Sequence, residues 1–166
     1  MLVKIRPAEL ADAQAIAEIW NQIIQTELYS ALDTPVTVEV QRKFLVNLPD
    51  RGVFLVATAP EDQQVVGFQV LDPFATYTHA FDHVAVVGTC VRLSLRRQGI
   101  GMQLSDVSSK EAKKKGFEKL FTYVRADNEA ALHFYQKIGF VAIGTAKKHA
   151  KIGGAYVDSV FLERPL

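Results

Sequence analysis

The middle of the chain carries the junction Val91-Arg92-Leu93-Ser94-Leu95-Arg96-Arg97-Gln98-Gly99-Ile100-Gly101. The β-branched run before it, His83 to Val91, predicts a central strand, and the amphipathic run Gly99 to Lys115 predicts a helix. Free N–H groups and the dipole at a helix start attract anions, and glycine lets a phosphate approach the backbone closely. Because Arg96 and Arg97 add positive charge at the same place, the junction predicts a pyrophosphate site.

Two better-known phosphate motifs do not fit this junction. A P-loop is excluded because no Gly-Lys-Ser/Thr follows, and a dinucleotide-binding motif is excluded because one of its three glycines is missing. A Gly-x-Gly turn by itself is more often a tight structural turn than a ligand site. The anion interpretation therefore depends on what the rest of the chain contains.

Hydrophobic periodicity and turn residues predict the remaining elements. They are, in order, a strand at 2–6, helices at 11–24 and 37–48, a strand pair at 53–58 and 65–71, a strand at 119–124, a helix at 128–138, and strands at 140–144 and 156–162. No linker, repeat or low-complexity stretch interrupts this order. Residues 1–166 are therefore expected to form one mixed α/β domain.

The composition is that of a folded domain, since 49% of the 166 residues are hydrophobic and 22% are charged. The one cysteine, Cys90, excludes an internal disulfide and a cysteine-rich zinc site, and the four histidines lack metal-ligand spacing, so no metal is expected. No apolar run approaches the roughly 20 residues that span a bilayer, and residues 1–7 lack the apolar core of a signal peptide. We therefore expect a cytoplasmic protein that does not associate with membranes.

Charge is divided unevenly along the chain, although the formal net charge is +1. Residues 1–90 hold 5 basic and 11 acidic side chains, whereas residues 91–166 hold 14 and 7. The positive second half favours an anionic partner, and the acidic first half favours a cationic or amine ligand. A nucleic-acid partner is not expected, because the cluster Lys113-Lys114-Lys115 has no interleaved aromatic residues.

A second motif lies downstream and reads Asn128-x-x-Ala131-x-x-Phe134-Tyr135-x-Lys137-x-Gly139-Phe140. Together with Arg96-x-x-Gly99-x-Gly101, it resembles the GCN5-related N-acetyltransferases, the GNAT family. The first block is similar to the family's pyrophosphate loop for acetyl-CoA, and the second is similar to its late helix. The resemblance covers nearly the whole chain. It implies an α/β (α+β) fold with a mixed, mainly antiparallel seven-stranded sheet, about four flanking helices, and a fourth and fifth strand that splay apart.

The resemblance also implies acetyl-CoA as co-substrate and nominates the residues that hold it. The backbone of the glycine loop would bind the pyrophosphate, and the end of the preceding strand would pair with the pantetheine arm like an added strand. Asn128 suits a helix cap, and the family motif implies a cofactor contact from the same residue. The full set implied for acetyl-CoA is Thr89, Cys90, Val91, Arg96, Arg97, Gln98, Gly99, Ile100, Gly101, Met102 and Asn128.

Tyr135 is the candidate general acid, because it matches the family's Phe/Leu-Tyr position and a phenol has a pKa similar to that of the leaving thiolate. The alternative is an ordinary half-buried aromatic side chain beside Phe134. Cys90 is interpreted as an inert buried residue, since no histidine is positioned to activate it. Attack of the amine on the thioester is therefore expected to be direct.

The general base is not evident from the sequence. The opening Ile5-Arg6-Pro7-Ala8-x-x-x-Asp12-x-x-x-Ile16 and the later Pro35-Val36-Thr37 resemble the phosphinothricin and methionine-sulfoximine acetyltransferases, which carry a glutamate where this chain has Val86. Side chains at or before the start of that strand offer alternatives, none favoured over the others: Tyr77, His79, Asp82 and His83. Aromatic residues in the same region are expected to form a wall of the acceptor site: Phe74, Tyr77, His79 and Phe81.

The predicted function is the transfer of an acetyl group from acetyl-CoA to a primary amine of a small molecule by a single-domain N-acetyltransferase. A non-catalytic acyl-CoA-binding or sensory module on the same fold is the alternative, since a fold does not determine a function. Val86 in place of a glutamate favours the module, whereas Tyr135 favours the enzyme. The acceptor is not evident from the sequence. The oligomeric state is equally open, and a homodimer is one possibility because dimers are common in such folds.

Overall fold

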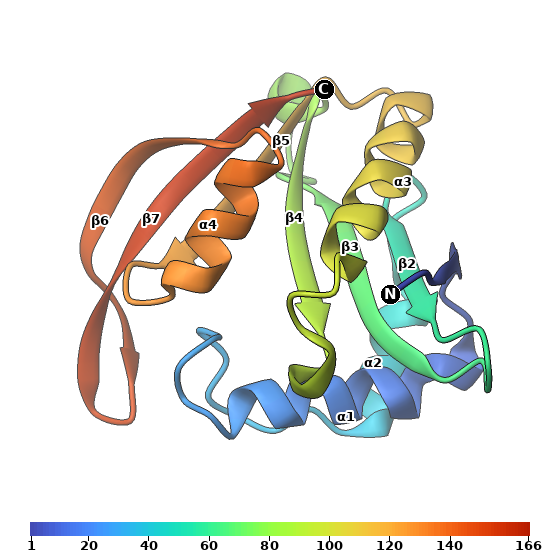
Figure 1. The fold of residues 1–166 in the computed structure, drawn as a ribbon. Helices are drawn as coiled ribbons and strands as arrows, with labels where there is room; N and C mark the ends of the chain where they lie inside the picture. Colours follow the sequence, from blue (N-terminus) through green and yellow to red (C-terminus); the bar gives the residue numbers. More distant parts are fainter.

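One seven-stranded sheet organises the chain, as a computed structural model that describes all of residues 1–166 shows (Figure 1). The strands lie in the order β1-β2-β3-β4-β5-β7-β6, and every neighbouring pair is antiparallel except β4 and β5. The predicted mixed, mainly antiparallel sheet of seven strands is therefore confirmed. The strands are β1 (Lys4–Pro7), β2 (Val53–Thr58), β3 (Val65–Pro73), β4 (Val84–Val91), β5 (Lys119–Arg125), β6 (Val141–Ile152) and β7 (Ala155–Pro165).

Four helices cover the sheet, with α3 and α4 on one face and α1 and α2 on the other (Figure 1). Three short 3₁₀ turns, η1 to η3, lie in the connections. The helices are α1 (Ala13–Ile24), α2 (Val38–Val46), α3 (Ile100–Lys114) and α4 (Glu129–Lys137), and the turns are η1 (Leu10–Asp12), η2 (His79–Phe81) and η3 (Leu93–Leu95).

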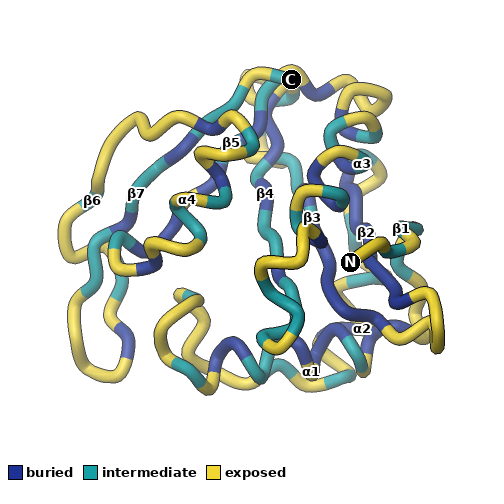
Figure 2. Tube along the Cα trace, in the orientation of Figure 1, coloured by how far each residue is buried: buried dark blue, intermediate teal, exposed yellow.

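Each face of the sheet has its own apolar core. On the α3–α4 side, Leu104 and Leu120 belong to a cluster of 17 buried residues. On the other side, the isoleucines of α1 recur at helical spacing, so that Ile16 and Ile19 both reach Phe68 and its neighbours in a smaller cluster. Figure 2 shows that β2 and β3 are mostly buried and that β4 mixes buried and half-buried residues, whereas β6 is almost entirely exposed.

The sheet divides between β4 and β5. These parallel strands pair only from Val84 to Val86, opposite Lys119 to Phe121. One further contact crosses the gap, where the Thr122 hydroxyl donates a hydrogen bond of 2.9 Å to the Val87 carbonyl oxygen. Beyond it, the β5-facing edge of β4 has no strand partner. The splayed fourth and fifth strands implied by the family resemblance are therefore present.

The last two strands are much longer than the sequence predicts. The predicted spans 140–144 and 156–162 become β6 and β7, which continue to a tight turn at Gly153-Gly154, where both φ angles are positive. In this hairpin β6 is solvent-exposed along nearly its whole length, and register shifts interrupt its pairing with β7. The hydrophobic alternation that reveals a half-buried strand is therefore absent from most of β6.

The chain start also differs slightly from the prediction. The predicted helix 11–24 begins as the turn η1 and becomes α-helical only at Ala13. Arg6 holds this entrance through two hydrogen bonds, of 2.7 and 2.8 Å, to the Asp12 carboxylate. No helix in the chain combines the length and apolar character needed to cross a bilayer.

Candidate functional site

The glycine loop connects β4 to α3 through η3, as the sequence predicts. Gly99 caps α3 with a φ of 79°, a left-handed conformation that favours glycine. Arg97 also has a positive φ, of 62°. The N–H groups of the first helical turn have no carbonyl partner within the helix. The loop therefore presents backbone donors and two arginines beside the unpaired edge of β4.

Gly101 has a role that the sequence reading missed. A Cβ atom at this position would lie 3.0 Å from the ring of Phe134, which belongs to α4. A side chain here would press on a packed aromatic ring, so glycine favours the close approach of α3 and α4. We therefore expect a bulky residue at Gly101 to disturb the packing of α4 on α3, in addition to any effect on a bound phosphate.

The side chains of the glycine loop contact distant parts of the chain. The Arg96 guanidinium lies 4.0 Å from the centre of the Tyr29 ring, a cation–π arrangement. The Gln98 carbonyl oxygen accepts a hydrogen bond of 2.8 Å from the Met1 ammonium. Met102 remains partly exposed, whereas Ile100 is buried in the core. Among the predicted loop residues, backbone groups and the two arginines are thus the ones left for an anionic ligand.

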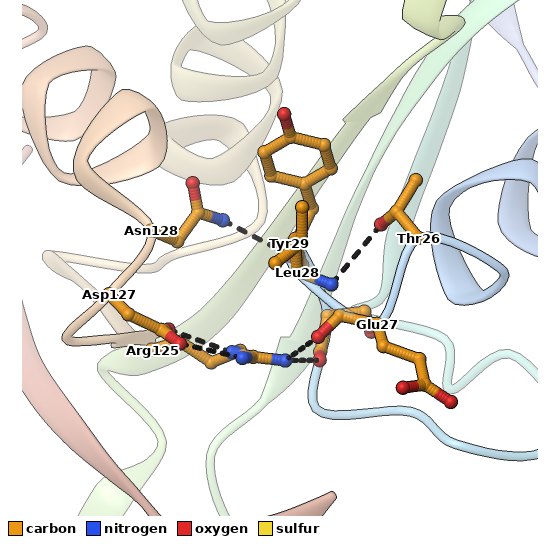
Figure 3. Close-up of polar contacts among 8 residues, drawn as sticks. Thr26, Glu27, Leu28, Tyr29, Arg125, Asp127 and Asn128 are labelled. Carbon is orange, nitrogen blue, oxygen red and sulfur yellow. Dashed lines mark hydrogen bonds and ion pairs between the residues drawn. The ribbon is translucent and has the colours of Figure 1, made fainter. Parts of the chain in front are cut away.

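The segment between α1 and α2 is fastened to the start of α4 (Figure 3). Arg125 donates hydrogen bonds to the carbonyl oxygens of Glu27 and Ser30, at 2.5 and 3.2 Å, and also pairs with Asp127. The Asn128 amide donates to the Tyr29 carbonyl oxygen at 3.2 Å. Because Tyr29 also stacks on Arg96, this segment connects the glycine loop to α4.

Asn128 confirms its predicted capping role. Its side-chain oxygen accepts a hydrogen bond of 3.1 Å from the Ala131 N–H in the first turn of α4. The residue is 7% exposed, and both polar atoms of its side chain are bonded within the protein. A direct contact from this side chain to acetyl-CoA would require it to exchange one of these bonds.

Tyr135 lies between the two diverging strands. Its hydroxyl donates a hydrogen bond of 3.2 Å to Thr89 Oγ1 on β4, and Thr122 on β5 also lies within hydrogen-bonding reach. The side chain is 5% exposed, so it is more deeply buried than the half-buried position considered from the sequence. Burial raises the pKa of Tyr135, partly offset by its hydroxyl contacts. The phenol therefore remains a neutral proton donor at physiological pH.

Thr89, Cys90 and Val91 form the end of β4 whose outer edge is unpaired. Gln69 donates a 2.7 Å hydrogen bond to Thr89 Oγ1, which positions the hydroxyl that also accepts the hydrogen bond from Tyr135. Cys90 faces the opposite side of the sheet and packs against Phe68 in the α1 cluster. Burial raises the pKa of its thiol to about 12, so the residue is the inert cysteine that the sequence predicts.

The aromatic wall is only partly composed of the predicted residues. Phe74 packs against Phe81 and against Phe121 of β5, with ring centres 5.1 and 5.5 Å apart. Tyr77 is 84% exposed, and the His79 side chain is fully exposed, with its ring nitrogen bonded to Asp82. The structure therefore brings Phe74 and Phe81 together but leaves Tyr77 and His79 in solvent.

Phe121 was missed because the predicted strand 119–124 does not by itself reveal which strand lies beside it. In the structure it is the register partner of Val86, the position for which the family resemblance implies a glutamate. No group of three or more His, Cys, Asp or Glu side chains is arranged to hold a metal ion.

Comparison with known proteins shows which family has this sequence. Residues 16–140 match the Acetyltransferase (GNAT) family. The chain is 24% identical over 166 residues to the phosphinothricin N-acetyltransferase of Streptomyces coelicolor, covering 99% of this chain and 96% of that protein. It is 29% identical over 164 residues to the L-amino acid N-acetyltransferase AaaT of Escherichia coli, covering 98% and 97%.

A solved structure gives the same fold. A GNAT phosphinothricin acetyltransferase from Sinorhizobium meliloti, in complex with acetyl-CoA, superimposes with a TM-score of 0.91 over 100% of this chain and 89% of that one, at 20% identity. The family match spans most of the domain, including both the glycine loop and α4. This chain therefore belongs to the GNAT family and is an acetyl-CoA-dependent N-acetyltransferase.

Proposed function

We propose that this protein transfers the acetyl group of acetyl-CoA to the primary amine of a small, amino-acid-like molecule by direct attack. The observation that carries the proposal is the position of Tyr135, whose buried hydroxyl lies between the diverging strands β4 and β5 and beside Thr89. A thioester lying along the unpaired edge of β4 would bring its sulfur toward this phenol.

Acetyl-CoA would bind in two sections. The unpaired edge of β4 at Thr89, Cys90 and Val91 offers backbone groups to the amides of the pantetheine arm, as an added strand would. The pyrophosphate would lie against the backbone of residues 96–102, where the start of α3 offers free N–H groups. Arg96 and Arg97 supply charge there, and Asn128 organises the start of α4 next to the same opening.

Tyr135 would act as the general acid. When the amine attacks the carbonyl carbon, the C–S bond breaks and the thiolate needs a proton. The Tyr135 pKa is raised by burial, so the phenol carries its proton throughout the neutral range. Its hydroxyl is oriented by Thr89, which is itself held by Gln69. A positioned acid of this kind contributes a rate factor of about 10²–10⁴.

A direct attack agrees with the state of Cys90. An acyl-enzyme would require a thiolate near the thioester, but this thiol is buried, protonated, and on the α1 side of the sheet. The acetyl group would therefore pass from sulfur to nitrogen in one transfer.

The proposed acceptor class comes from two observations. The named relatives are phosphinothricin and L-amino acid N-acetyltransferases, so an acceptor with an α-amino acid framework is the natural candidate. The packed rings of Phe74, Phe81 and Phe121 offer an apolar surface for the acceptor's side chain. A panel of L-amino acids, phosphinothricin and methionine sulfoximine, followed by thiol release from acetyl-CoA, tests this assignment. If none of these amines raises thiol release above the rate measured without an amine, the assignment is contradicted.

The alternative of a non-catalytic acyl-CoA-binding module, which Val86 favours, does not agree with the match to N-acetyltransferases. A module would bind acetyl-CoA but release no coenzyme A with any amine, so turnover of one acceptor is sufficient to exclude it.

A further inference from the structure

A carboxylate lies on β3, the strand next to Val86, where the family resemblance implies a glutamate. Asp72 is the penultimate residue of β3, and its register partner on β4 is Val86. Directly opposed residues of an antiparallel pair have Cβ atoms about 4.5–5.5 Å apart. A carboxylate carried by Asp72 therefore lies one strand away from the position where related enzymes carry theirs.

Asp72 and Val86 point to the same side of the sheet. Their chain neighbours Leu71, Ala85 and Val87 all belong to the core beneath α3 and α4. Because successive side chains alternate, Asp72 and Val86 face the other side, which α1 and α2 cover only in part. The donor site lies along the β4 edge near Tyr135, so this opposite side is where an acceptor can approach the thioester.

The surroundings of Asp72 leave room for an amine. Gly88, diagonal to Asp72 on β4, has no side chain, and a Cβ atom there would meet only Val70 within 4 Å. Phe74 follows two residues after Asp72 on the same side and packs on Phe121, the other register partner of Val86. An open spot bordered by a carboxylate and two aromatic rings suits an ammonium group on an apolar framework.

The carboxylate of Asp72 has no partner of its own. It is half-buried, and it forms no hydrogen bond or ion pair with another residue. None of the charged or titratable side chains on the neighbouring elements forms a bond with the Asp72 carboxylate. They are Glu18, bonded to Gln14; Arg51, near Asp82; Lys119, paired with Glu163; and His83, which forms no side-chain hydrogen bond.

Burial raises the pKa of the Asp72 carboxyl above its ordinary value, and no neighbouring charge opposes this. A carboxylate with a raised pKa is a better proton acceptor, and it is a more suitable base near neutral pH. An unpartnered, half-buried acid also costs the folded state stability, which favours a functional rather than a structural role.

We propose that Asp72 is the general base that deprotonates the acceptor amine, replacing the glutamate absent at Val86. This role rests on the proposed acetyl transfer. The acceptor ammonium gives one proton to the Asp72 carboxylate, directly or through one water, and Asp72 later releases it to solvent. The nitrogen lone pair forms the C–N bond as the C–S bond breaks. Tyr135 protonates the departing thiolate, and the second proton lost by nitrogen restores the phenol.

Asp72→Asn tests the proposal, with Asp50→Asn as the matched control for loss of an exposed carboxylate that forms no side-chain hydrogen bond. We expect kcat/KM of Asp72→Asn to fall about 10²- to 10⁴-fold at pH 7, while the Kd of acetyl-CoA stays unchanged. The loss should shrink as the pH approaches the pKa of the amine, because the free amine needs no base. Asp50→Asn should keep the wild-type profile.

Two further measurements separate a base from a structural residue. Adding Val86→Glu to Asp72→Asn should restore at least part of the lost rate, because it returns a carboxylate to the same place from the adjacent strand. At pH 7 the Asp72→Asn variant should unfold at the same temperature as the wild type or a higher one, since it removes a buried charge without a partner.

The outcomes distinguish this role from the reaction itself. If the wild type is active and Asp72→Asn keeps its rate, or loses it equally at every pH, the base assignment is overturned and the proposed acetyl transfer stands. A lower melting temperature of Asp72→Asn at pH 7 would also overturn it, by showing that the carboxylate holds the fold. A wild type that acetylates no amine would contradict the proposed function, and the role of Asp72 with it.

Discussion

The Tyr135 hydroxyl donates a hydrogen bond to Thr89 Oγ1 across 3.2 Å, and this contact joins α4 to the unpaired end of β4. It sets the candidate acid at the place where the sheet divides. Since β4 and β5 pair over only three residues, the same division provides an edge for a ligand and a gap into which the phenol projects. The proposed binding of acetyl-CoA and the proposed role of Tyr135 thus both depend on the separation of β4 from β5.

Removing the Tyr135 hydroxyl should slow the reaction without weakening donor binding. In Tyr135→Phe the ring keeps its packing against Phe134 and Phe140, so we expect kcat to fall about 10²- to 10⁴-fold and the Kd of acetyl-CoA to remain near wild type. Steady-state kinetics under conditions where chemistry is rate-limiting provide the measurement. Tyr123→Phe, at an exposed position on β5, is the control. A Tyr135→Phe enzyme as fast as wild type would make Tyr135 a structural residue.

The glycine loop should bind acetyl-CoA partly through charge. We expect the Kd to rise with ionic strength, because in the proposed complex Arg96 and Arg97 lie near the phosphates of acetyl-CoA. Gln98→Glu, which adds a negative charge to this loop, should weaken binding by about tenfold, an energy of roughly 1.4 kcal/mol. Thr145→Glu makes a comparable charge change on the exposed strand β6 and should have no effect. Calorimetry at several salt concentrations measures both, and a salt-independent Kd would argue against the electrostatic contribution.

Cys90 should be dispensable for catalysis and resistant to alkylation. With a pKa of about 12, its thiolate fraction at pH 8 is on the order of one part in ten thousand. Thiol labelling should therefore be slow in the native protein and fast after unfolding. Cys90→Ala should cost about 1 kcal/mol of stability, because the site is packed, yet retain kcat. Loss of kcat in a folded Cys90→Ala variant would reopen the acyl-enzyme route.

Asp12 should stabilise the fold in a pH-dependent way. Burial alone would raise its pKa, but hydrogen bonds from Arg6 and from the Glu9 N–H outweigh burial and leave the pKa below its ordinary value. A carboxyl with a lowered pKa in the folded state stabilises above its unfolded pKa, and this stabilisation is lost as pH falls through the folded value. Asp12→Asn should lower the unfolding free energy by about 2 kcal/mol at pH 7.

The difference between wild type and Asp12→Asn should narrow in acid, below about pH 4, as the wild-type carboxyl itself becomes protonated. Denaturant unfolding at pH 7 and in acid measures it. Glu61→Gln, at an exposed hairpin position, is the control for loss of an acidic charge. A difference that is constant across this pH range would show that the ion pair is not its source.

Much of the fold was predictable because local signals are strong in the buried half of the chain. The strand Val53–Thr58 was predicted with its observed bounds, since its β-branched and apolar residues are all buried. The start of α3 follows from Gly99, and that of α4 from Asn128, which caps its first turn as expected. The exposed strand β6 lacked such a pattern, so its length was underestimated.

The candidate site can be read from the sequence where its residues are contiguous, and it cannot where it depends on the register between strands. The glycine loop and Tyr135 lie in contiguous motifs, so the sequence alone nominates both as site residues. The hydrogen bond from Arg125 to the Glu27 carbonyl oxygen joins residues far apart in the sequence, so no local sequence pattern predicts it. The same applies to Asp72, because only the pairing of β3 with β4 places it opposite Val86.

The central claim is that the acetyl group passes directly from acetyl-CoA to an amine at the division between β4 and β5. A rapid-quench experiment under single-turnover conditions, with mass spectrometry of both the small molecules and the intact protein, tests it most directly. We predict that the acetyl group appears on the nitrogen of an amino-acid-type acceptor at the rate at which acetyl-CoA disappears, and that no acetylated protein accumulates. An acetylated protein that forms and decays on the path to product, or acetyl-CoA that persists with every amine, would contradict this account.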